Sequence, residues 1–122
     1  MSKLDLKNIS ENLIDTFISA GQLSLDLRNQ GLTKKIKSDN TPVSNGDLEV
    51  NKIITEKIKK ITPDLPIISE ETSDNKSLND LKDFWLVDPI DGTYDYINNL
   101  NEFTINAGLI INKQPVLGLI YA

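Results

Sequence analysis

The feature that most constrains the fold is the apolar run Phe84 to Val87, which leads directly into Asp88-Pro89-Ile90-Asp91-Gly92-Thr93. A continuous apolar run that ends in turn-forming residues predicts a short strand with both faces covered. The length of 122 residues, of which 39% are hydrophobic, suits one domain or a part of one.

Two amphipathic helices are predicted before this strand. The first runs from Asn8 to about Asn29, with Ser10 or Asn8 as its N-cap and Gly31 at its end. Its apolar stripe consists of Ile9, Leu13, Phe17 and Gly21, widened by Ile14, Ile18 and Leu25. The second helix runs from about Asn45 to Ile61, and its apolar face consists of Leu48, Val50, Ile53, Ile54, Ile58 and Ile61.

Shorter segments complete the prediction. Residues 34–37 are strand-like and are followed by turn chemistry over 38–42, and a strand at 67–68 ends at Ser69-Glu70-Glu71. Residues 72–82 are polar and predict a surface loop. A short helix is expected from near Gly92 to about Asn98, then strands over 103–111 and 115–121 around a turn at 112–114. The last strand is apolar and nothing in the sequence covers it, which predicts that the chain is the N-terminal part of a longer protein.

Composition excludes several kinds of chemistry. The chain has no Cys and no His, so it can form neither a disulfide framework, a zinc ribbon, a cysteine nucleophile nor a Ser-His-Asp triad. Asp and Glu number 18 against 13 Lys and Arg, which argues against a nucleic-acid polymer as partner. The charged first residues and the lack of a run of about 20 apolar residues predict a soluble cytoplasmic protein. Carboxylates, hydroxyls, lysines or a hard metal must carry any catalysis.

Acidic residues gather where predicted strands end or a helix begins: at Asp47, at Glu70-Glu71, and at Asp88 with Asp91. Pro89 stiffens the exit of the strand, and Gly92 allows a tight turn. A helix that starts near Gly92 would point its free N–H groups back toward the two carboxylates. Oxygen-rich ligands of this kind suit Mg²⁺, which takes a few carboxylates together with phosphate and water.

Plainer interpretations exist for each cluster. Asp-Pro and Asp-Gly are ordinary turn formers. Glu70-Glu71 alone also fits a solvated acidic pair, and Asp47 fits the last position of a capping box begun by Ser44. Two metal-loop motifs fail on spacing. A calcium EF-hand loop would not have Ile90 at its third position, and the haloacid-dehalogenase motif places its two aspartates two residues apart rather than three.

Taken together, the motifs resemble those of the lithium-sensitive, Mg²⁺-dependent phosphatases of the inositol monophosphatase superfamily. The resemblance covers nearly the whole chain and rests on Asp39-Asn40-Thr41-Pro42-Val43-Ser44-x-x-Asp47, Ser69-Glu70-Glu71 and Trp85 to Thr93. The chain is most similar to the CysQ-type 3′(2′),5′-bisphosphate nucleotidases, through Lys37 to Val43, Pro63-Asp64-x-Pro66 and Asn101 to Asn106. The fold class this implies is α+β, the N-terminal half of the layered sugar-phosphatase fold, with two helices packed on a mainly antiparallel sheet.

The resemblance also implies roles for individual residues. Glu70, Asp88 and the carbonyl of Ile90 would hold one Mg²⁺, and Asp88 with Asp91 would hold a second. The phosphate would lie against these ligands and against Gly92 and Thr93. Thr93 and Asp47 would orient and deprotonate the attacking water, with Glu71 behind the ligands. The implied reaction removes the 3′-phosphate of adenosine 3′,5′-bisphosphate to give AMP, without a phospho-enzyme.

Some positions depart from the family pattern. Asn45-Gly46 precedes Asp47 where relatives usually carry an alanine or an acidic residue, and Tyr94-Asp95-Tyr96 replaces a more usual Lys-Glu-Phe. The second half of the family domain, with a further metal-binding aspartate, is not in the sequence. An inositol-1-phosphate phosphatase remains an alternative, and so does a non-catalytic fragment that binds Mg²⁺ and pairs with another chain. Family members are often dimers, so a homodimer is one expected assembly.

Overall fold

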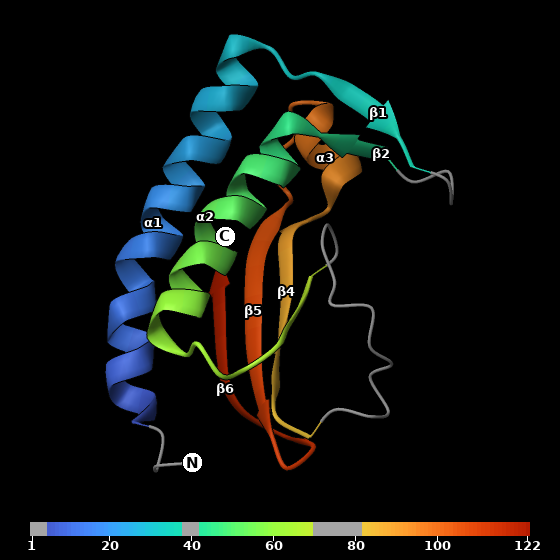
Figure 1. Ribbon diagram of the computed structural model, residues 1–122. Helices are drawn as coiled ribbons and strands as arrows, with labels where there is room; N and C mark the ends of the chain where they lie inside the picture. Colours follow the sequence, from blue (N-terminus) through green and yellow to red (C-terminus); the bar gives the residue numbers. More distant parts are fainter. Residues whose placement is uncertain (1–4, 38–41, 70–81) are drawn as a thin grey trace.

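The structure is a computed structural model that describes residues 5–37, 42–69 and 82–122 (Figure 1). The predictions for residues 38–41 and for the loop over 72–81 therefore lie outside the described ranges. The elements follow in the order α1 (Leu6–Gln30), β1 (Lys34–Ile36), β2 (Pro42–Ser44), α2 (Asn45–Ile61), β3 (Ile67–Ser69), β4 (Phe84–Asp91), α3 (Thr93–Ile97), β5 (Thr104–Ile111) and β6 (Gln114–Tyr121).

Helix α1 begins earlier than the sequence predicted. Its N-cap is Asp5, whose carboxylate accepts the backbone N–H of Asn8 at 3.0 Å, so neither Ser10 nor Asn8 caps it. The added turn places Leu6 against the core, which favours the earlier start. The predicted end is confirmed, because Gly31 has a φ of 98° and its N–H donates to the carbonyl of Arg28.

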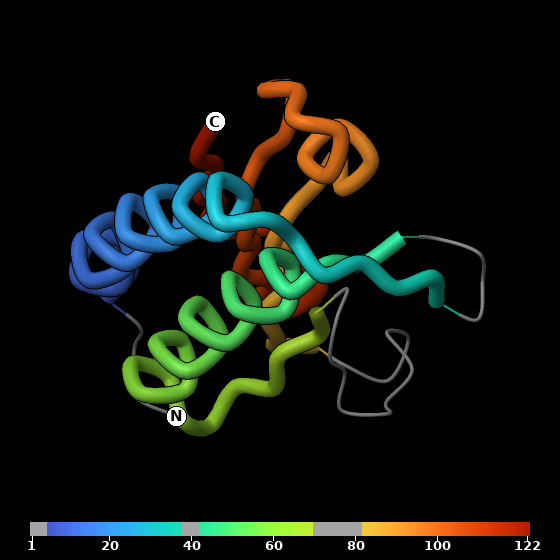
Figure 2. The backbone as a smooth tube through the Cα atoms, turned by 90° about the horizontal axis from the view of Figure 1, so that it is seen from above, coloured from blue at the N-terminus to red at the C-terminus, as the bar shows by residue number. Residues whose placement is uncertain are grey.

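Helices α1 and α2 run antiparallel and lie side by side over the sheet (Figures 1 and 2). The core lies between them and the sheet, and its fully buried members include Leu13, Ile54, Ile58, Trp85 and Leu109. Burying such side chains is worth about 1.5–3 kcal/mol each, so this layer supplies most of the hydrophobic stabilisation of the chain.

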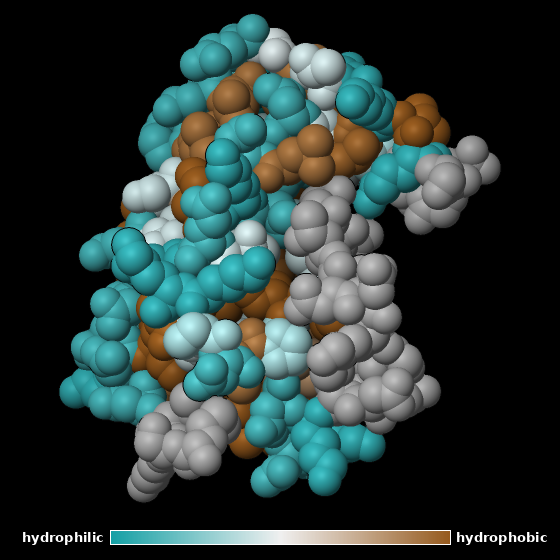
Figure 3. Space-filling model, in the orientation of Figure 1, coloured by the Kyte–Doolittle hydropathy of each residue, from teal (hydrophilic) through white to brown (hydrophobic). Residues whose placement is uncertain are grey.

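The apolar stripes are narrower than predicted. Ile14 and Ile18 on α1 are 48% and 49% exposed, Leu25 is also exposed, and so is Leu48 on α2. The expectation that Ile14, Ile18 and Leu25 widen the buried face of α1 was therefore wrong, and so was the assignment of Leu48 to the apolar face of α2. Polar side chains cover much of the helical face, broken by apolar patches (Figure 3). Within the described ranges, no helix combines the length and apolar character that a membrane crossing requires.

The main sheet has four strands in the order β3-β4-β5-β6. Strand β3 is parallel to β4, and the other two pairs are antiparallel, so the predicted α+β class with a mainly antiparallel sheet is confirmed. The β5–β6 connection is a two-residue turn in which Asn112 and Lys113 both have positive φ. This geometry is typical of tight hairpins, because it matches the twist of the strands.

Strand β4 differs from its prediction in two ways. It continues through Pro89 to Asp91 instead of stopping at Asp88-Pro89. It is also covered on one face only: Trp85 and Val87 face the helices and are buried, whereas Leu86 is 40% exposed on the opposite face. The expectation of two covered faces was wrong for the described chain, because both long helices pack on the same side.

A second, two-stranded sheet pairs β1 with β2 in antiparallel register. The sequence suggested only a turn ending at Pro42, and the strand Pro42–Ser44 was missed. Three residues are too few to show an alternating pattern, so pairing with β1 defines this strand. The small sheet lies next to the start of α2 and to α3 (Figure 1).

Candidate active site

The end of β4 contains an irregularity that brings two acidic residues together. Asp88 lies opposite Asn106 and Asp91 lies opposite Thr104, with a shift of register between them. Thr104 and Asn106 are two residues apart on β5 and share a face, as the hydrogen bond from the Asn106 amide to the Thr104 hydroxyl shows. The extra residue of this bulge inverts the alternation of β4, so Asp88 and Asp91 lie on the same face although they are three residues apart.

Gly92 turns the chain from β4 into α3. Its φ is 93°, in the left-handed region that favours glycine, and a Cβ there would lie 2.8 Å from the carbonyl oxygen of Glu102. Helix α3 then begins at Thr93 and ends at Ile97, close to the predicted bounds. The turn therefore places Thr93 directly beyond the aspartates.

Asp47 is fully buried at the start of α2 and meets Thr93 across 46 positions of sequence. The Thr93 hydroxyl donates to Asp47 Oδ1 at 2.7 Å, and it also lies 3.2 Å from the carbonyl oxygen of Ile90. The other oxygen, Oδ2, accepts the Ser44 hydroxyl at 2.6 Å and the Ser44 backbone N–H at 2.9 Å. The capping box predicted from Ser44 is present, and it fixes the carboxylate that Thr93 contacts.

One turn further along α2, Asn51 supports the end of β3. The Ser69 hydroxyl donates to Asn51 Oδ1 at 2.5 Å, and both side chains are buried. Helix α2 thus contacts both strand ends at which acidic residues were predicted to act. Sequence reasoning missed Asn51 because an amide four residues after Asp47 is an ordinary helix residue until its partner is known. Glu70 and Glu71, which follow Ser69, lie outside the described residues.

The donor chemistry of the described part of the site fits a hard divalent cation. Asp88, Asp91 and the carbonyl of Ile90 offer only oxygen atoms from one stretch of strand, and the sequence has neither His nor Cys. Mg²⁺ prefers such ligands and completes its shell with water and phosphate. In the ranges 5–37, 42–69 and 82–122, no group of three or more acidic side chains is arranged around one point. The predicted third carboxylate, Glu70, falls in the gap.

Tyr96 lies behind the Asp47–Thr93 pair and is fully buried. Burial raises the pKa of Tyr96 to about 12, the negative charge of Asp47 adds to this effect, and the positive charge of Arg28 opposes it. The tyrosine is therefore neutral over the physiological range. Its role here is packing and hydrogen bonding rather than proton transfer.

A hollow of about 490 Å³ lies on the open face of the sheet, beside Asp88. Asp88 and Asn106 line its polar part, and the apolar part is formed by Ile68, Leu86, Leu119 and Ile120. The acidic end of β4 therefore opens on the side of the sheet that the helices leave uncovered.

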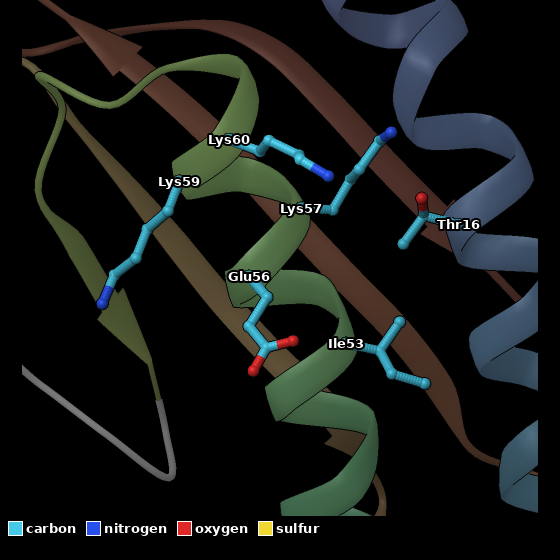
Figure 4. Close-up of a pocket in the computed structure, with 6 residues that line it drawn as sticks. All are labelled: Thr16, Ile53, Glu56, Lys57, Lys59 and Lys60. Carbon is cyan, nitrogen blue, oxygen red and sulfur yellow. The ribbon is translucent and has the colours of Figure 1, made fainter.

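A separate depression of about 630 Å³ lies on the helical side, between α1 and α2 (Figure 4). Lys57 and Lys60 extend toward α1 beside Thr16, whereas Lys59 points to the other side of α2 (Figure 4). Lys59 and Lys60 lie in the last turn of α2, where positive charge complements the helix dipole. Among the residues that the structure describes, no predicted site residue lines this depression.

Comparison with known proteins identifies the protein family of this chain. Residues 5–122 match the model of the inositol monophosphatase family. The 3′(2′),5′-bisphosphate nucleotidase CysQ of Aggregatibacter actinomycetemcomitans is 35% identical over 94% of this chain and 44% of its own length. CysQ of Buchnera aphidicola is 38% identical over 96% of this chain and 47% of its own length. The chain thus spans about half the length of the curated relatives it matches.

Solved structures share the fold. The suhB protein of Bartonella henselae superimposes with a TM-score of 0.82 at 24% identity, over 93% of this chain and 45% of that one. An inositol monophosphatase of Thermotoga maritima gives a TM-score of 0.78 at 27% identity, over 89% and 42%. The predicted half of the layered sugar-phosphatase fold is therefore confirmed. Because the family model covers the chain from residue 5 to residue 122, this chain belongs to the inositol monophosphatase family.

Proposed function

We propose that this chain is the N-terminal, metal-binding part of a Mg²⁺-dependent phosphate monoester hydrolase. The observation that carries the proposal is the hydrogen bond of 2.7 Å between Thr93 and the buried Asp47, beside the bulge that puts Asp88 and Asp91 on one face. Because the Thr93 hydroxyl donates its hydrogen to a buried carboxylate, its oxygen can accept a hydrogen from water while oxygen ligands hold a cation nearby.

The ligands proposed for a first Mg²⁺ are Glu70, Asp88 and the Ile90 carbonyl, and those for a second are Asp88 and Asp91. When bound, the ions supply positive charge to the phosphate oxygens and lower the pKa of the attacking water. Glu71 would support the ligands from behind. The described oxygens agree with this assignment in chemistry, since all are hard donors.

Thr93 and Asp47 can take up the proton that the attacking water loses. Thr93 donates to Asp47 Oδ1, which leaves the lone pairs of its hydroxyl oxygen free to accept a hydrogen of the attacking water. As the water oxygen bonds to phosphorus, the bond between phosphorus and the ester oxygen of the substrate breaks, and the departing oxygen takes a proton from solvent water. The proton of the attacking water passes to Thr93 while the Thr93 proton passes to Asp47. Ser44 holds the other carboxylate oxygen, so Asp47 does not rotate away. The main chain at Gly92 and Thr93 would position the phosphate.

The substrate we propose is adenosine 3′,5′-bisphosphate, which would lose its 3′-phosphate to give AMP. Support comes from the relatives at 35% and 38% identity, which are both 3′(2′),5′-bisphosphate nucleotidases. Inositol-1-phosphate is the competing substrate, since the family and the Thermotoga maritima neighbour are inositol monophosphatases.

The test is phosphate release at fixed Mg²⁺ with each substrate in turn, for this chain and for the complete gene product that carries it. Asp91→Asn is the inactivating variant, and Asp15→Asn is its matched control, because Asp15 is an exposed aspartate on α1. Removing one metal ligand should lower kcat by at least about a hundredfold. Calorimetric titration with Mg²⁺ should show weaker binding in Asp91→Asn alone.

Three results would count against the proposal. Equal activity of Asp91→Asn and Asp15→Asn would exclude the metal assignment. Faster turnover of inositol-1-phosphate would replace the substrate while keeping the chemistry. Mg²⁺ binding without turnover in both proteins would favour the non-catalytic fragment.

A further inference from the structure

We infer that Tyr96 is a positioning residue, which holds Thr93 against Asp47 through a contact with Gly46 and a hydrogen bond to α1. This inference rests on the proposed function and names a further residue of the same site. The contacts that the structure gives the Tyr96 side chain in hydrogen bonding and ring packing are with Ser24, Phe103 and Arg28. Tyr96 acts through the two helices that carry Asp47 and Thr93.

The first contact joins α3 to α1. The Tyr96 hydroxyl donates to the carbonyl oxygen of Ser24 at 2.6 Å, and both residues are fully buried. The Tyr96 ring also packs edge-on against Phe103, with ring centroids 4.9 Å apart. A buried ring held at its hydroxyl and at its edge cannot swing aside without losing both contacts.

The second contact joins α3 to the first turn of α2. A Cβ on Gly46 would lie 2.6 Å from Cε2 and 2.7 Å from Cζ of Tyr96, and closer still to its hydroxyl oxygen. Only glycine therefore fits at position 46 while Tyr96 occupies this place. The two departures from the family pattern, at Asn45-Gly46 and at Tyr94-Asp95-Tyr96, meet at this contact.

The two contacts bear on the pair proposed to activate water. Gly46 directly precedes Asp47, and Tyr96 follows Thr93 by three residues, a spacing that puts neighbours on the same side of a helix. The ring thus sets how closely α3 approaches α2. The distance between the Thr93 hydroxyl and Asp47 depends on that approach.

Arg28, in the last turn of α1, secures the segment that follows α3. Its guanidinium donates to the carbonyl oxygen of Leu100 and to the side chain of Asn101, both at 2.8 Å. The same group lies over the rings of Tyr96 and Phe103, at 5.6 and 5.3 Å from their centroids. Helix α1 therefore contacts α3 at Tyr96 and also contacts the segment that follows α3, at Leu100 and Asn101.

The experiment is a double-mutant cycle in the complete gene product, with Gly46→Ala, Tyr96→Phe and both changes together. Gly46→Ala should push the Tyr96 ring away and separate Thr93 from Asp47. A displacement of about 1 Å costs on the order of a hundredfold in kcat. KM should change much less than kcat, since Ile90 and Asp91, which would also contact the phosphate, lie on β4 rather than on the displaced helix. Tyr96→Phe alone should lower kcat, because the hydrogen bond to Ser24 is lost. In Gly46→Ala, it should restore part of the loss, because it removes the atom nearest to the new Cβ and leaves the ring free to shift.

Lys52→Ala is the matched control, because Lys52 is an exposed residue of the same helix α2. Parent-like kcat in Gly46→Ala would overturn the inference, and so would a fall in thermal stability with kcat unchanged. If Gly46→Ala does not fold, Tyr96→Phe/Gly46→Ala provides the test: recovery of fold and activity supports the inference, and no recovery overturns it.

A second readout does not depend on activity. Thr93→Val removes the hydrogen bond to Asp47 and should lower the midpoint of urea denaturation in the parent protein, but much less in Gly46→Ala, where that bond is already broken. Equal losses in both backgrounds would overturn the positioning role. If the parent hydrolyses neither substrate, the proposed function fails, while this cycle still decides whether Tyr96 positions Thr93.

Discussion

Because of Tyr96, the stability of the folded chain should decrease as the pH rises through the alkaline range. The ordinary pKa of Tyr96 is 10.0, and burial raises the pKa to about 12 in the folded chain. Between these values the unfolded chain has lost the tyrosine proton and the folded chain has kept it. The unfolded state then binds fewer protons, so stability falls as pH rises through this window, and the full contribution is present only below the lower value.

The size of the effect follows from the same two values. A difference of about two in pKa corresponds to roughly 2–3 kcal/mol of unfolding free energy lost across the window. Tyr96→Phe removes the titrating group together with its hydrogen bond to Ser24, which costs about 1 kcal/mol at neutral pH. At pH 8 the parent should therefore be more stable than Tyr96→Phe by about 1 kcal/mol. At the upper end of the pH window it should be less stable than Tyr96→Phe.

The assay is urea denaturation of the parent and of Tyr96→Phe at a series of pH values, which cancels the titration of every shared group. Tyr94→Phe is the control, because Tyr94 is 69% exposed and its variant should follow the parent curve. Ultraviolet absorbance of tyrosinate, in a protein with Tyr94 and Tyr121 replaced by Phe, reports Tyr96 directly. Parallel curves for parent and Tyr96→Phe throughout the window would refute the reasoning.

Two further perturbations test the packing around the site. Gly92→Ala combines a positive φ with a Cβ 2.8 Å from the Glu102 carbonyl oxygen, whereas Gly31→Ala has a positive φ but open space around its Cβ. Calorimetric melting should therefore show a larger loss of stability for Gly92→Ala, by about 1–3 kcal/mol. Equal losses would mean that the contact with Glu102 does not matter. Leu13→Ala should cost about 2–5 kcal/mol because Leu13 is fully buried, and Ile14→Ala much less because that side chain is 48% exposed. Similar denaturant midpoints for these two variants would contradict the observed packing of α1.

Local patterns predicted most of the elements. The predictions failed where several local alternatives were possible and tertiary contacts decide among them. The bounds of α2 and its capping box could be predicted because one turn of helix contains both the donor and the acceptor. The N-cap of α1 was misplaced because Asp5, Asn8 and Ser10 can all cap a helix, and the position of Leu6 in the core decides among them. Leu48 was assigned to the core because apolar character does not tell which side of a wide stripe meets a neighbour.

The sequence by itself determined the kinds of chemistry available and the local conformations. Without Cys or His, oxygen atoms must carry the site, and Gly92 must turn the chain into α3. Tertiary structure alone decided how these pieces meet. The bulge that aligns Asp88 with Asp91 depends on register with β5, and the contact of Thr93 with Asp47 joins residues 46 positions apart. Local preferences act over a few residues, whereas strand register and helix packing depend on the whole buried core.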